Sequence, residues 1–347
     1  MLTIKKRTAA IIISLILLIL GLLGSYIFYI LNNKDVRISI VGDILLDRGV
    51  KAQIESKGRG YPYLEVKDVF KKSDAVIGNL ECPITENSNP ILKDKKLIFK
   101  ADVENAAELK SAGFSILNLA NNHSMDQGSE GLKSTISNLN KAGIMTVGAG
   151  MNREDASKPG FVKISGTTAG VLGFSHFPAE GYFFSEDKPD VAQVNENIKK
   201  HVIEAKSKCD FLVVTLHWGR EFNNYPSDYQ IDLAHSLIEN GADVVIGHHP
   251  HVLQGVEKFK GKLIFYSVGN FVFDKQIPKG ADETVILNVT LNKSSLRQVE
   301  IIPIKIWRAQ PKKLSGKDAE ELINKVKKYS RDMNTEIVFD QGIWKVK

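Results

Sequence analysis

The sequence predicts an α/β protein with a largely parallel sheet. Short apolar runs recur along the chain, helical segments separate many of them, and most runs end in glycine followed by polar residues. Strands that alternate with helices are typical of parallel sheets. Ligands bind such sheets at the carboxyl ends of the strands. The polar residues that follow the apolar runs are therefore the candidates for a functional site.

The expected strands are the apolar runs, and they cover residues 36–41, 74–80, 114–120, 144–147, 161–164, 168–174, 211–216, 244–246, 263–270, 285–290 and 298–307. The expected helices cover residues 67–73, 106–112, 128–142, 194–208, 229–240 and 316–332. Gly113, Gly143 and Gly241 follow three of these helices, and glycine is the usual residue at a helix end. The last two strands read as an antiparallel pair, which indicates a second, mixed sheet. The aromatic and acidic segment from Pro178 to Pro189 is an expected loop over the site.

Length, charge and cysteine content narrow the class of protein. The 347 residues allow one large domain or two small ones. The formal net charge of +6 comes from scattered lysines without a basic stripe of interleaved aromatics, so we expect no nucleic-acid partner. This mild excess of positive charge fits an anionic polymer or a membrane surface as a partner. Cys82 and Cys209 make no zinc-type Cys-x-x-Cys pair, and we expect two small buried residues, with a single disulfide as the alternative.

The apolar segment near the N-terminus has the length of a membrane-spanning helix. Lys5-Lys6-Arg7 precedes an uncharged apolar run from Thr8 to Leu31, and about 20 such residues cross a bilayer as a helix. Signal-peptide cores are shorter, about 7–15 residues, and end in a small-x-small cleavage site that is not clear here. Because the basic flank favours a cytoplasmic N-terminus, we expect a single-pass signal anchor in the cell membrane. The chain after about Asn33 would then be extracytoplasmic, with a cleaved signal peptide as the alternative.

Polar residues with metal-ligand chemistry follow five of the expected strands. They are Asp43, Asn79, Glu81, Asn122, His123, His217, His249 and His251. Carboxylate, amide and imidazole groups suit Mn, Fe or Zn. If the strands lie side by side, their ends converge on one centre for one or two divalent ions. Taken singly, several of these residues also fit an ordinary turn at a strand end.

The densest of these groups is Gly247-His248-His249-Pro250-His251, which follows a short apolar run. It holds three of the eight histidines in the chain, and neutral imidazole is the commonest metal ligand. Proline fixes its own φ and favours an extended residue before it. Residues two apart in an extended chain point the same way, so we expect His249 and His251 to face one metal together. We expect His248 to support them, and structural or surface histidines are the alternative.

Six blocks of residues, in this order, carry a resemblance to a known family. They are Val41–Arg48 (VGDILLDR), Gly78–Thr85 (GNLECPIT), Leu119–Asp126 (LANNHSMD), Leu216–Gly219 (LHWG), Gly247–Gly255 (GHHPHVLQG) and Tyr266–Phe273 (YSVGNFVF). The chain resembles the CapA family of poly-γ-glutamate capsule biosynthesis, within the calcineurin-like metallophosphoesterase superfamily. The resemblance covers roughly residues 36–275 and implies a four-layer αββα sandwich rather than a plain doubly wound sheet. We expect the anchor in residues 1–35, this domain in residues 36–310, and a C-terminal helix and strand in residues 311–347 packed on it.

The resemblance also implies roles for single residues. The metal ligands would be Asp43, Glu81 as the bridging carboxylate, Asn122, His217, His249 and His251. His123 matches the histidine that is a candidate general acid. Members of the superfamily ordinarily carry a histidine two residues after the first aspartate, where this chain has Leu45, and Asn79 is a candidate to supply the missing ligand. Apart from the resemblance, Arg48 and Arg220 lie close in sequence to expected ligands and are candidates for contact with an anionic substrate, with surface ion pairs as the alternative. Asn270 is a candidate residue at the mouth of the site.

Two functional hypotheses follow from these residues and the resemblance. The first is a membrane-anchored, metal-dependent hydrolase or transferase that acts on an anionic polymer or its precursor outside the membrane. The second is a non-catalytic subunit of a polymer synthesis and export complex, in which the site binds metal or polymer and the anchor helix binds membrane-embedded partners. A soluble cytoplasmic nuclease of the same superfamily is disfavoured by the anchor.

Overall fold

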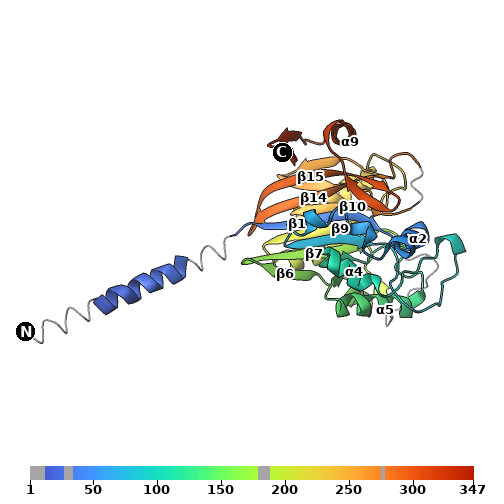
Figure 1. Cartoon of the computed structure of the whole chain (residues 1–347), viewed down its shortest axis with the longest axis horizontal. Coiled ribbons are helices and arrows are strands. Elements are labelled where there is room, and N and C mark those ends of the chain that lie inside the picture. Colours follow the sequence, from blue (N-terminus) through green and yellow to red (C-terminus); the bar gives the residue numbers. More distant parts are fainter. Residues whose placement is uncertain (1–11, 27–33, 179–187, 275–277) are drawn as a thin grey trace, which may run out of the picture.

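The computed structural model describes residues 12–26, 34–178, 188–274 and 278–347 of the chain. The main body is a mixed α/β sandwich of two sheets (Figure 1), which confirms the predicted α/β class. The expected loop over the site falls largely on residues 179–187, which lie outside the described residues.

The larger sheet contains ten strands among the described residues. Its strands are β1 (Val36–Ile44), β2 (Ala75–Leu80), β3 (Ile116–Asn118), β4 (Met145–Val147), β13 (Asn270–Val272), β14 (Glu283–Asn292), β15 (Ser295–Trp307), β16 (Gln310–Lys313), β17 (Ile337–Asp340) and β18 (Ile343–Val346). Their order is β17-β18-β15-β14-β1-β2-β3-β4, with β13 beside β1 and β16 beside β15. The strands from β1 to β4 are parallel, as expected from the helices between them.

The smaller sheet has six strands in the described part of the chain. They are β6 (Gly160–Ile164), β7 (Thr167–Ser175), β9 (Phe211–His217), β10 (Val244–His248), β11 (Val256–Phe259) and β12 (Lys262–Phe265). Their order is β11-β12-β10-β9-β7-β6, and β6 and β7 form the predicted hairpin. A short separate ladder joins β5 (Ala149–Gly150) and β8 (Asp190–Val191).

Helices cover both outer faces of the sandwich. The helices in the described part of the main body are α2 (Arg48–Lys57), α3 (Lys67–Phe70), α4 (Asn105–Ala112), α5 (Gly128–Lys141), α6 (Arg153–Ala156), α7 (Ile198–Lys206), α8 (Asp228–Glu239) and α9 (Gly316–Tyr329), with short 3-10 turns at Tyr61–Tyr63 and Lys95–Leu97. Successive residues of a strand point to opposite faces, so β1 turns Ile38 and Ile40 toward the smaller sheet. Helices α2, α4 and α5 pack on the other face of the larger sheet, and α7 and α8 pack on the smaller sheet. The layers therefore run helix, sheet, sheet, helix.

The expected strand at residues 263–270 is divided between the two sheets. Its first part, β12, pairs with β10, whereas β13 pairs with β1 and sets Asn270 beside Asp43. Gly269 has φ 71°, a left-handed backbone that glycine adopts at little cost. A Cβ on Gly247 would lie 1.8 Å from the carbonyl oxygen of Tyr266, so the two backbones touch there. This crossing brings the end of β10 against the end of β1. The sequence pattern predicted one strand here, although Ser267 and Gly269 interrupt its apolar run.

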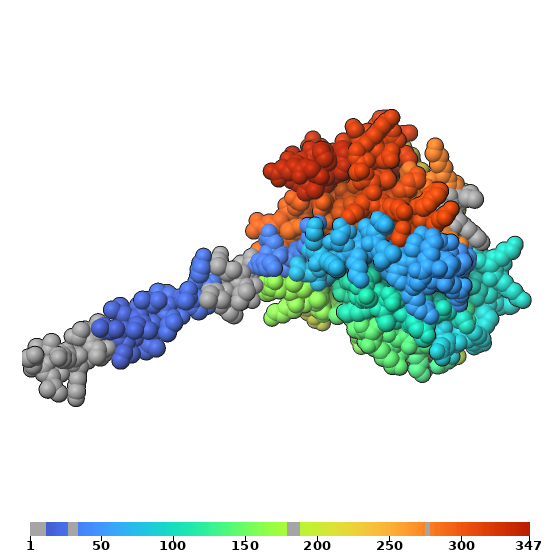
Figure 2. Space-filling view, viewed as in Figure 1, coloured from blue at the N-terminus to red at the C-terminus, as the bar shows by residue number. Residues whose placement is uncertain are grey.

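Residues 12–26 form a helix that stands apart from the sandwich (Figures 1 and 2). All of its residues are exposed, and most are large and apolar. Among the described residues, no helix combines the length and apolar character needed to cross a membrane. The predicted anchor runs from Thr8 to Leu31, so part of it lies outside the described residues, and the anchor stays a prediction.

The C-terminal segment adds α9 and a hairpin to the larger sheet. Leu322 and Val326 of α9 pack into the core between the sheets, and β18 pairs with β15. The sequence predicted a helix and one strand here, and the structure has two strands because β17 folds back on β18. Cys82 is buried, Cys209 is partly buried, and both are free thiols.

Candidate metal centre

The candidate site lies where strand ends of the two sheets meet. Asp43, near the end of β1, lies in register with Asn79 of β2 and with Asn270 of β13. In the smaller sheet, His217 ends β9 beside His248, the last residue of β10. Parallel strands end at the same edge of a sheet, so the sequence pattern of an apolar run and a polar end places these side chains together.

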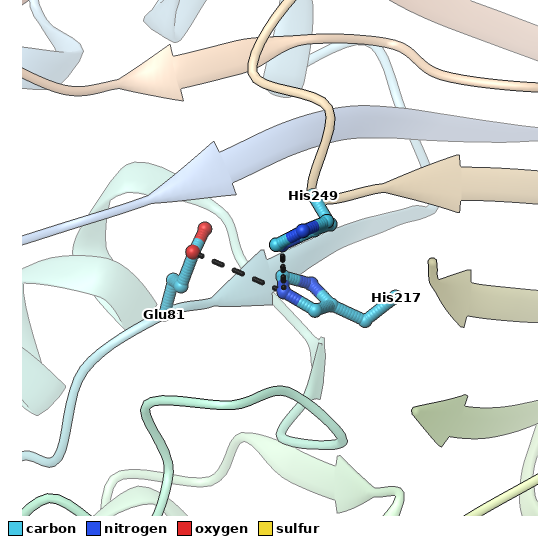
Figure 3. A group of neighbouring side chains, drawn as sticks. All are labelled: Glu81, His217 and His249. Atoms are coloured by element: carbon cyan, nitrogen blue, oxygen red, sulfur yellow. Dashed lines mark hydrogen bonds and ion pairs between the residues drawn. The ribbon is translucent and has the colours of Figure 1, made fainter. Parts of the chain in front are cut away.

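One group of ligands surrounds the imidazole of His217, and we call it the imidazole half-site (Glu81, Asn122, His217 and His249). The Nε2 atom of His217 lies 2.9 Å from Asn122 Oδ1, 3.1 Å from His249 Nδ1 and 3.9 Å from Glu81 Oε1. Figure 3 shows Glu81, His217 and His249 pointing toward one another from different elements. Atoms bound at about 2.0–2.2 Å to one ion lie roughly 3.0–3.5 Å apart. The imidazole half-site is therefore close to the geometry that one ion needs.

A second group, the carboxylate half-site, contains Asp43, Glu81 and His251. One ligand atom from each of these residues lies within 4.8 Å of the other two. His251 Nε2 is 3.8 Å from Glu81 Oε1, and His251 Nδ1 is 3.5 Å from Asp43 Oδ2. Glu81 belongs to both half-sites, and its Oε1 atom faces both. A carboxylate in this position can bridge two ions about 3.5–4 Å apart.

The buried carboxylates of the site favour the binding of cations. Burial, followed by the negative charge of Asp43, raises the pKa of Glu81 well above its ordinary value. Burial alone would also raise the pKa of Asp43, but the neighbouring imidazoles of His248 and His251 outweigh it and hold that pKa well below its ordinary value. The Oε2 atom of Glu81 is buried without a hydrogen-bond partner among the described residues. Because a buried polar atom without a partner is costly, this atom fits a metal ligand.

The histidines of the two half-sites differ in protonation. Burial, followed by the charge of His249, lowers the pKa of His217 well below 6.5, so its imidazole is neutral and ready to bind metal. Burial would lower the pKa of His251 too, but Glu81 and Asp43 outweigh burial and raise it to about 9. Without metal, His251 therefore holds a proton that a bound cation replaces. The residues of both half-sites fit a divalent metal.

The backbone around Pro250 is not extended as we expected. His249 has φ 92° and His251 has φ 59°, which are left-handed values that L-residues adopt at a cost. The N–H of His249 donates to Asp43 Oδ2 over 3.2 Å, and Pro250 O accepts from Phe222 N–H over 2.8 Å. These two hydrogen bonds stabilise the left-handed backbone of the loop from His249 to His251. Ligand atoms of the two imidazoles lie within 4.8 Å of each other, but His249 belongs to the imidazole half-site and His251 to the carboxylate half-site. The expectation that both bind one metal therefore stays a prediction.

Asparagines hold several of the ligands in place. Asn79 donates from Nδ2 to Asp43 Oδ1 over 2.8 Å, and its own oxygen accepts from Asn118 over 2.9 Å. This orientation turns the Asn79 oxygen away from Asp43, and its predicted role as a ligand stays a prediction. Asn270 Oδ1 accepts from His251 Nδ1 over 2.9 Å. A hydrogen bond to one imidazole nitrogen fixes the tautomer that offers the other nitrogen to metal, so here Asn270 positions His251.

The predicted general acid, His123, sits beside Asn122 in a charged and aromatic pocket. Its Nδ1 atom lies 3.1 Å from Asp126 Oδ2 and 3.2 Å from Lys93 Nζ. Lys93 and Asp126 form an ion pair of 2.6 Å, and Phe99 packs against the imidazole with 4.4 Å between ring centroids. Sequence reasoning assigned no role to Asp126 or Lys93. Asp126 stands three residues after His123, a spacing that could have indicated the pair.

The two candidate substrate arginines differ in their surroundings. Arg48 forms an ion pair of 2.5 Å with Asp274 and lies 4.8 Å from the ring centroid of Phe99 and 5.5 Å from that of Phe273. Its Nε atom is buried and has no hydrogen-bond partner in the described part of the chain. Arg220 is exposed and makes no ion pair with a described residue. It lies on the loop after β9.

That loop also contains Glu221, which sequence reasoning missed. Its Oε1 atom lies 4.0 Å from Nε2 of His251, and its side chain is 51% exposed, so it stands at the mouth of the centre. A carboxylate four residues after His217, in a polar segment that follows a strand, was the available signal.

His248, expected as a supporting residue, has its Nδ1 atom 3.2 Å from Asp43 Oδ1. The structure thus brings six of the predicted ligands together, turns the oxygen of Asn79 away, and adds an unforeseen carboxylate. The six are Asp43, Glu81, Asn122, His217, His249 and His251.

Comparison with known proteins identifies the family. The family described as bacterial capsule synthesis protein PGA_cap matches residues 37–275. The PGA biosynthesis protein CapA of Bacillus subtilis (strain 168) is 37% identical over 298 residues, which cover 85% of this chain and 78% of that protein. The capsule biosynthesis protein CapA of Bacillus anthracis is 34% identical over 292 residues, which cover 82% and 71%. A probable polyglutamine synthesis accessory protein of Mycobacterium tuberculosis (strain ATCC 25618 / H37Rv) is 27% identical over 359 residues, covering 88% and 94%.

Solved structures with more distant similarity also align with the chain. The NAD nucleotidase of Haemophilus influenzae has a TM-score of 0.49 and 13% identity, covering 85% of this chain and 63% of that one. A hypothetical protein from Thermus thermophilus has a TM-score of 0.43 and 16% identity, covering 80% and 96%. Similarity at this level carries no argument about function.

Proposed function

This chain belongs to the bacterial capsule synthesis protein family, and on that premise we propose that it serves the synthesis of an anionic capsule polymer of the poly-γ-glutamate type through a metal-dependent, hydrolase-type site. The domain would have the calcineurin-like metallophosphoesterase fold. The relatives from Bacillus are described as capsule and PGA biosynthesis proteins. The polymer or its precursor is the corresponding substrate or ligand for this chain.

The observation that carries the proposal is the environment of Glu81. Its carboxylate is 1% exposed, one of its oxygens has no hydrogen-bond partner among the described residues, and it faces ligands of both half-sites. A carboxylate that served only packing or stability would be paired, because burial without a partner costs several kcal/mol. Mn, Fe and Zn all suit the surrounding carboxylates, amide and imidazoles.

The residues around the centre have separable roles in this proposal. A bound divalent metal supplies Lewis-acid polarisation and lowers the pKa of water. Asp126 stabilises the protonated form of His123, which then donates a proton from Nε2 to a leaving group. The guanidinium of Arg48, fixed by Asp274 and two aromatic rings, holds a carboxylate or phosphate of the substrate. Arg220 would add a second cation at the mouth.

The proposed location is the outer side of the cell membrane. The helix at residues 12–26 is exposed along its whole length, and Leu17 and Leu22 each leave 63% of their surface uncovered. Apolar surface of this extent is unfavourable in water, and a bilayer would cover it. Lys5-Lys6-Arg7 before this segment favours a cytoplasmic N-terminus. Membrane-embedded synthesis subunits are the partners that an anchor would meet there.

A second candidate function is a non-catalytic subunit of the polymer synthesis and export complex. The observation that favours it is Leu45, a fully buried apolar residue at the position where the superfamily ordinarily has a ligand. In this case the centre binds metal or polymer without turnover. The mycobacterial relative is described as a probable accessory protein.

A turnover screen separates the two functions. The full-length protein, in detergent and loaded with Mn²⁺, is tested on phosphodiesters, phosphomonoesters and γ-glutamyl peptides. Hydrolysis that is lost in a His123→Gln variant with unchanged metal content supports the enzyme. Bound metal without turnover of any of the three substrate classes supports the subunit, and no bound metal contradicts the proposed site.

A further inference from the structure

The two half-sites do not offer the same number of ligands. The imidazole half-site has Glu81, His217, His249 and the amide oxygen of Asn122. Among the described histidines and acidic residues, the carboxylate half-site brings together Asp43, Glu81 and His251. Leu45 lies two residues after Asp43, but its side chain is fully buried in the core against the helices and offers no donor atom.

Glu221 stands at the open side of the carboxylate half-site. Its Oε1 atom lies 4.0 Å from Nε2 of His251, the nitrogen that also faces Glu81 at 3.8 Å. Ligand atoms of Glu221, His249 and His251 all lie within 4.8 Å of one another. Among the described residues, His251 is the only basic group within ion-pair distance of Glu221. The carboxylate is therefore directed at the centre without a lysine or arginine partner to hold it there.

The loop that carries Glu221 is fixed to the histidine loop. Phe222 adopts a left-handed backbone with φ 61° and donates its N–H to Pro250 O over 2.8 Å. Gln254, which follows the histidines, donates to Asn223 O over 2.8 Å and accepts from Gln230 of α8 over 3.0 Å. These hydrogen bonds join the backbone next to Glu221 to the loop that carries His251. Only the half-exposed side chain has to move, by about 1 Å, to reach the separation of roughly 3 Å between ligands of one ion.

We propose that Glu221 is a metal ligand that completes the carboxylate half-site in place of the side chain missing at Leu45. This inference rests on the metal centre of the proposed function. The completed half-site offers three carboxylates and one imidazole, whereas the imidazole half-site offers two imidazoles, one carboxylate and one amide. Ligand sets rich in carboxylate oxygens suit Mn²⁺, whereas imidazole ligands suit Zn²⁺. The two half-sites therefore differ in metal preference, and the carboxylate half-site takes Mn²⁺.

The test is a manganese titration of the full-length protein in detergent, using wild type, Glu221→Gln and Glu239→Gln. Glu239 is the matched control, because it is a half-exposed glutamate at the end of α8 that pairs with Lys260. Isothermal calorimetry gives the number of ions and their affinities, and electron paramagnetic resonance detects coupling between two Mn²⁺ ions. Neither measurement depends on turnover.

We expect wild type and Glu239→Gln to bind two coupled Mn²⁺ ions. We expect Glu221→Gln to keep the ion of the imidazole half-site, to lose the coupled signal and to bind the second ion at least about tenfold more weakly. Two coupled ions with unchanged affinities in Glu221→Gln overturn the role of Glu221 and leave the proposed function intact. A wild-type protein that binds one ion, with the same affinity in Glu221→Gln, overturns it as well. A wild-type protein that binds no ion overturns the proposed function itself.

Discussion

The metal affinity of the carboxylate half-site should rise steeply with pH, because His251 must lose a proton when metal binds. Its pKa is raised to about 9 by Glu81 and Asp43 against the effect of burial. Below that pH, metal binding releases one proton from His251, so each unit of increase in pH strengthens binding about tenfold, or roughly 1.4 kcal/mol. Between pH 6 and pH 8 the expected gain is about 100-fold. His217 adds no slope in this range, because burial keeps its imidazole neutral.

The stability of the metal-free protein should change with pH in the opposite direction to the metal affinity. A histidine whose pKa is raised in the folded state stabilises the fold fully below its ordinary pKa of 6.5. That contribution is lost as the pH rises through about 9. Raising the pH therefore weakens the metal-free fold through His251 and strengthens the metal-bound one. The gain in melting temperature on adding Mn²⁺ should be larger at pH 8 than at pH 6.

The assay is calorimetric titration of the full-length protein with Mn²⁺ at pH 6, 7 and 8, in buffers with different ionisation enthalpies. The buffer dependence counts the protons released on binding. We expect about one proton from His251, and more if Glu81 is also protonated, since its pKa is raised. A His251→Gln variant is the control and should lose most of the slope. An affinity that changes less than about threefold over this range, without proton release, would refute the reasoning.

Three further outcomes follow from particular contacts. Gly247→Ala should lower the free energy of unfolding by roughly 3 kcal/mol, because its Cβ would lie 1.8 Å from Tyr266 O and 2.4 Å from Trp218 Nε1. Denaturant unfolding measures this loss of stability. Trp218→Phe should cost about 1–3 kcal/mol in the same assay, because it leaves the buried Tyr266 carbonyl without its 2.9 Å donor. Asp126→Asn should lower turnover by about 10- to 100-fold with unchanged metal content, because His123 loses its carboxylate partner; rates and metal analysis on the same sample measure both.

Each of these outcomes has a clear opposite. A Gly247→Ala protein as stable as wild type would mean that the strands do not cross as closely as described. An unchanged stability of Trp218→Phe would mean that another group reaches the Tyr266 carbonyl. An Asp126→Asn protein that turns over at the wild-type rate would exclude Asp126 as the residue that positions His123.

The sequence was sufficient for most of the centre because strand ends and ligand chemistry coincide. Asp43, Glu81 and His217 each follow an apolar run, and parallel strands end at a common edge. That these side chains lie close together could therefore be inferred from the sequence alone. The parallel strands β1 to β4 and the hairpin of β6 and β7 followed from the same alternation of apolar runs and helices.

The remaining features depend on contacts between distant segments. The left-handed backbone at His249 and His251 is imposed by Asp43 and by the loop at Phe222, which no local pattern reveals. The step from one sheet to the other before Asn270 lies where Ser267 and Gly269 interrupt the apolar run, but the sheet that each part joins depends on distant partner strands. Glu221 is an ordinary glutamate in the sequence, and the hydrogen bonds that join its loop to Pro250 and Gln254 place it near the centre.

The central claim is that this chain holds a divalent metal between the ends of its two sheets. Elemental analysis of the purified full-length protein tests it most directly, comparing wild type with the His249→Ala/His251→Ala double variant. A His201→Ala/His235→Ala variant, which removes two histidines outside the centre, is the control. We predict about one to two equivalents of transition metal in wild type and control, and roughly a tenth of that or less in the double variant. Equal metal content in all three proteins, or none in wild type, would contradict the account.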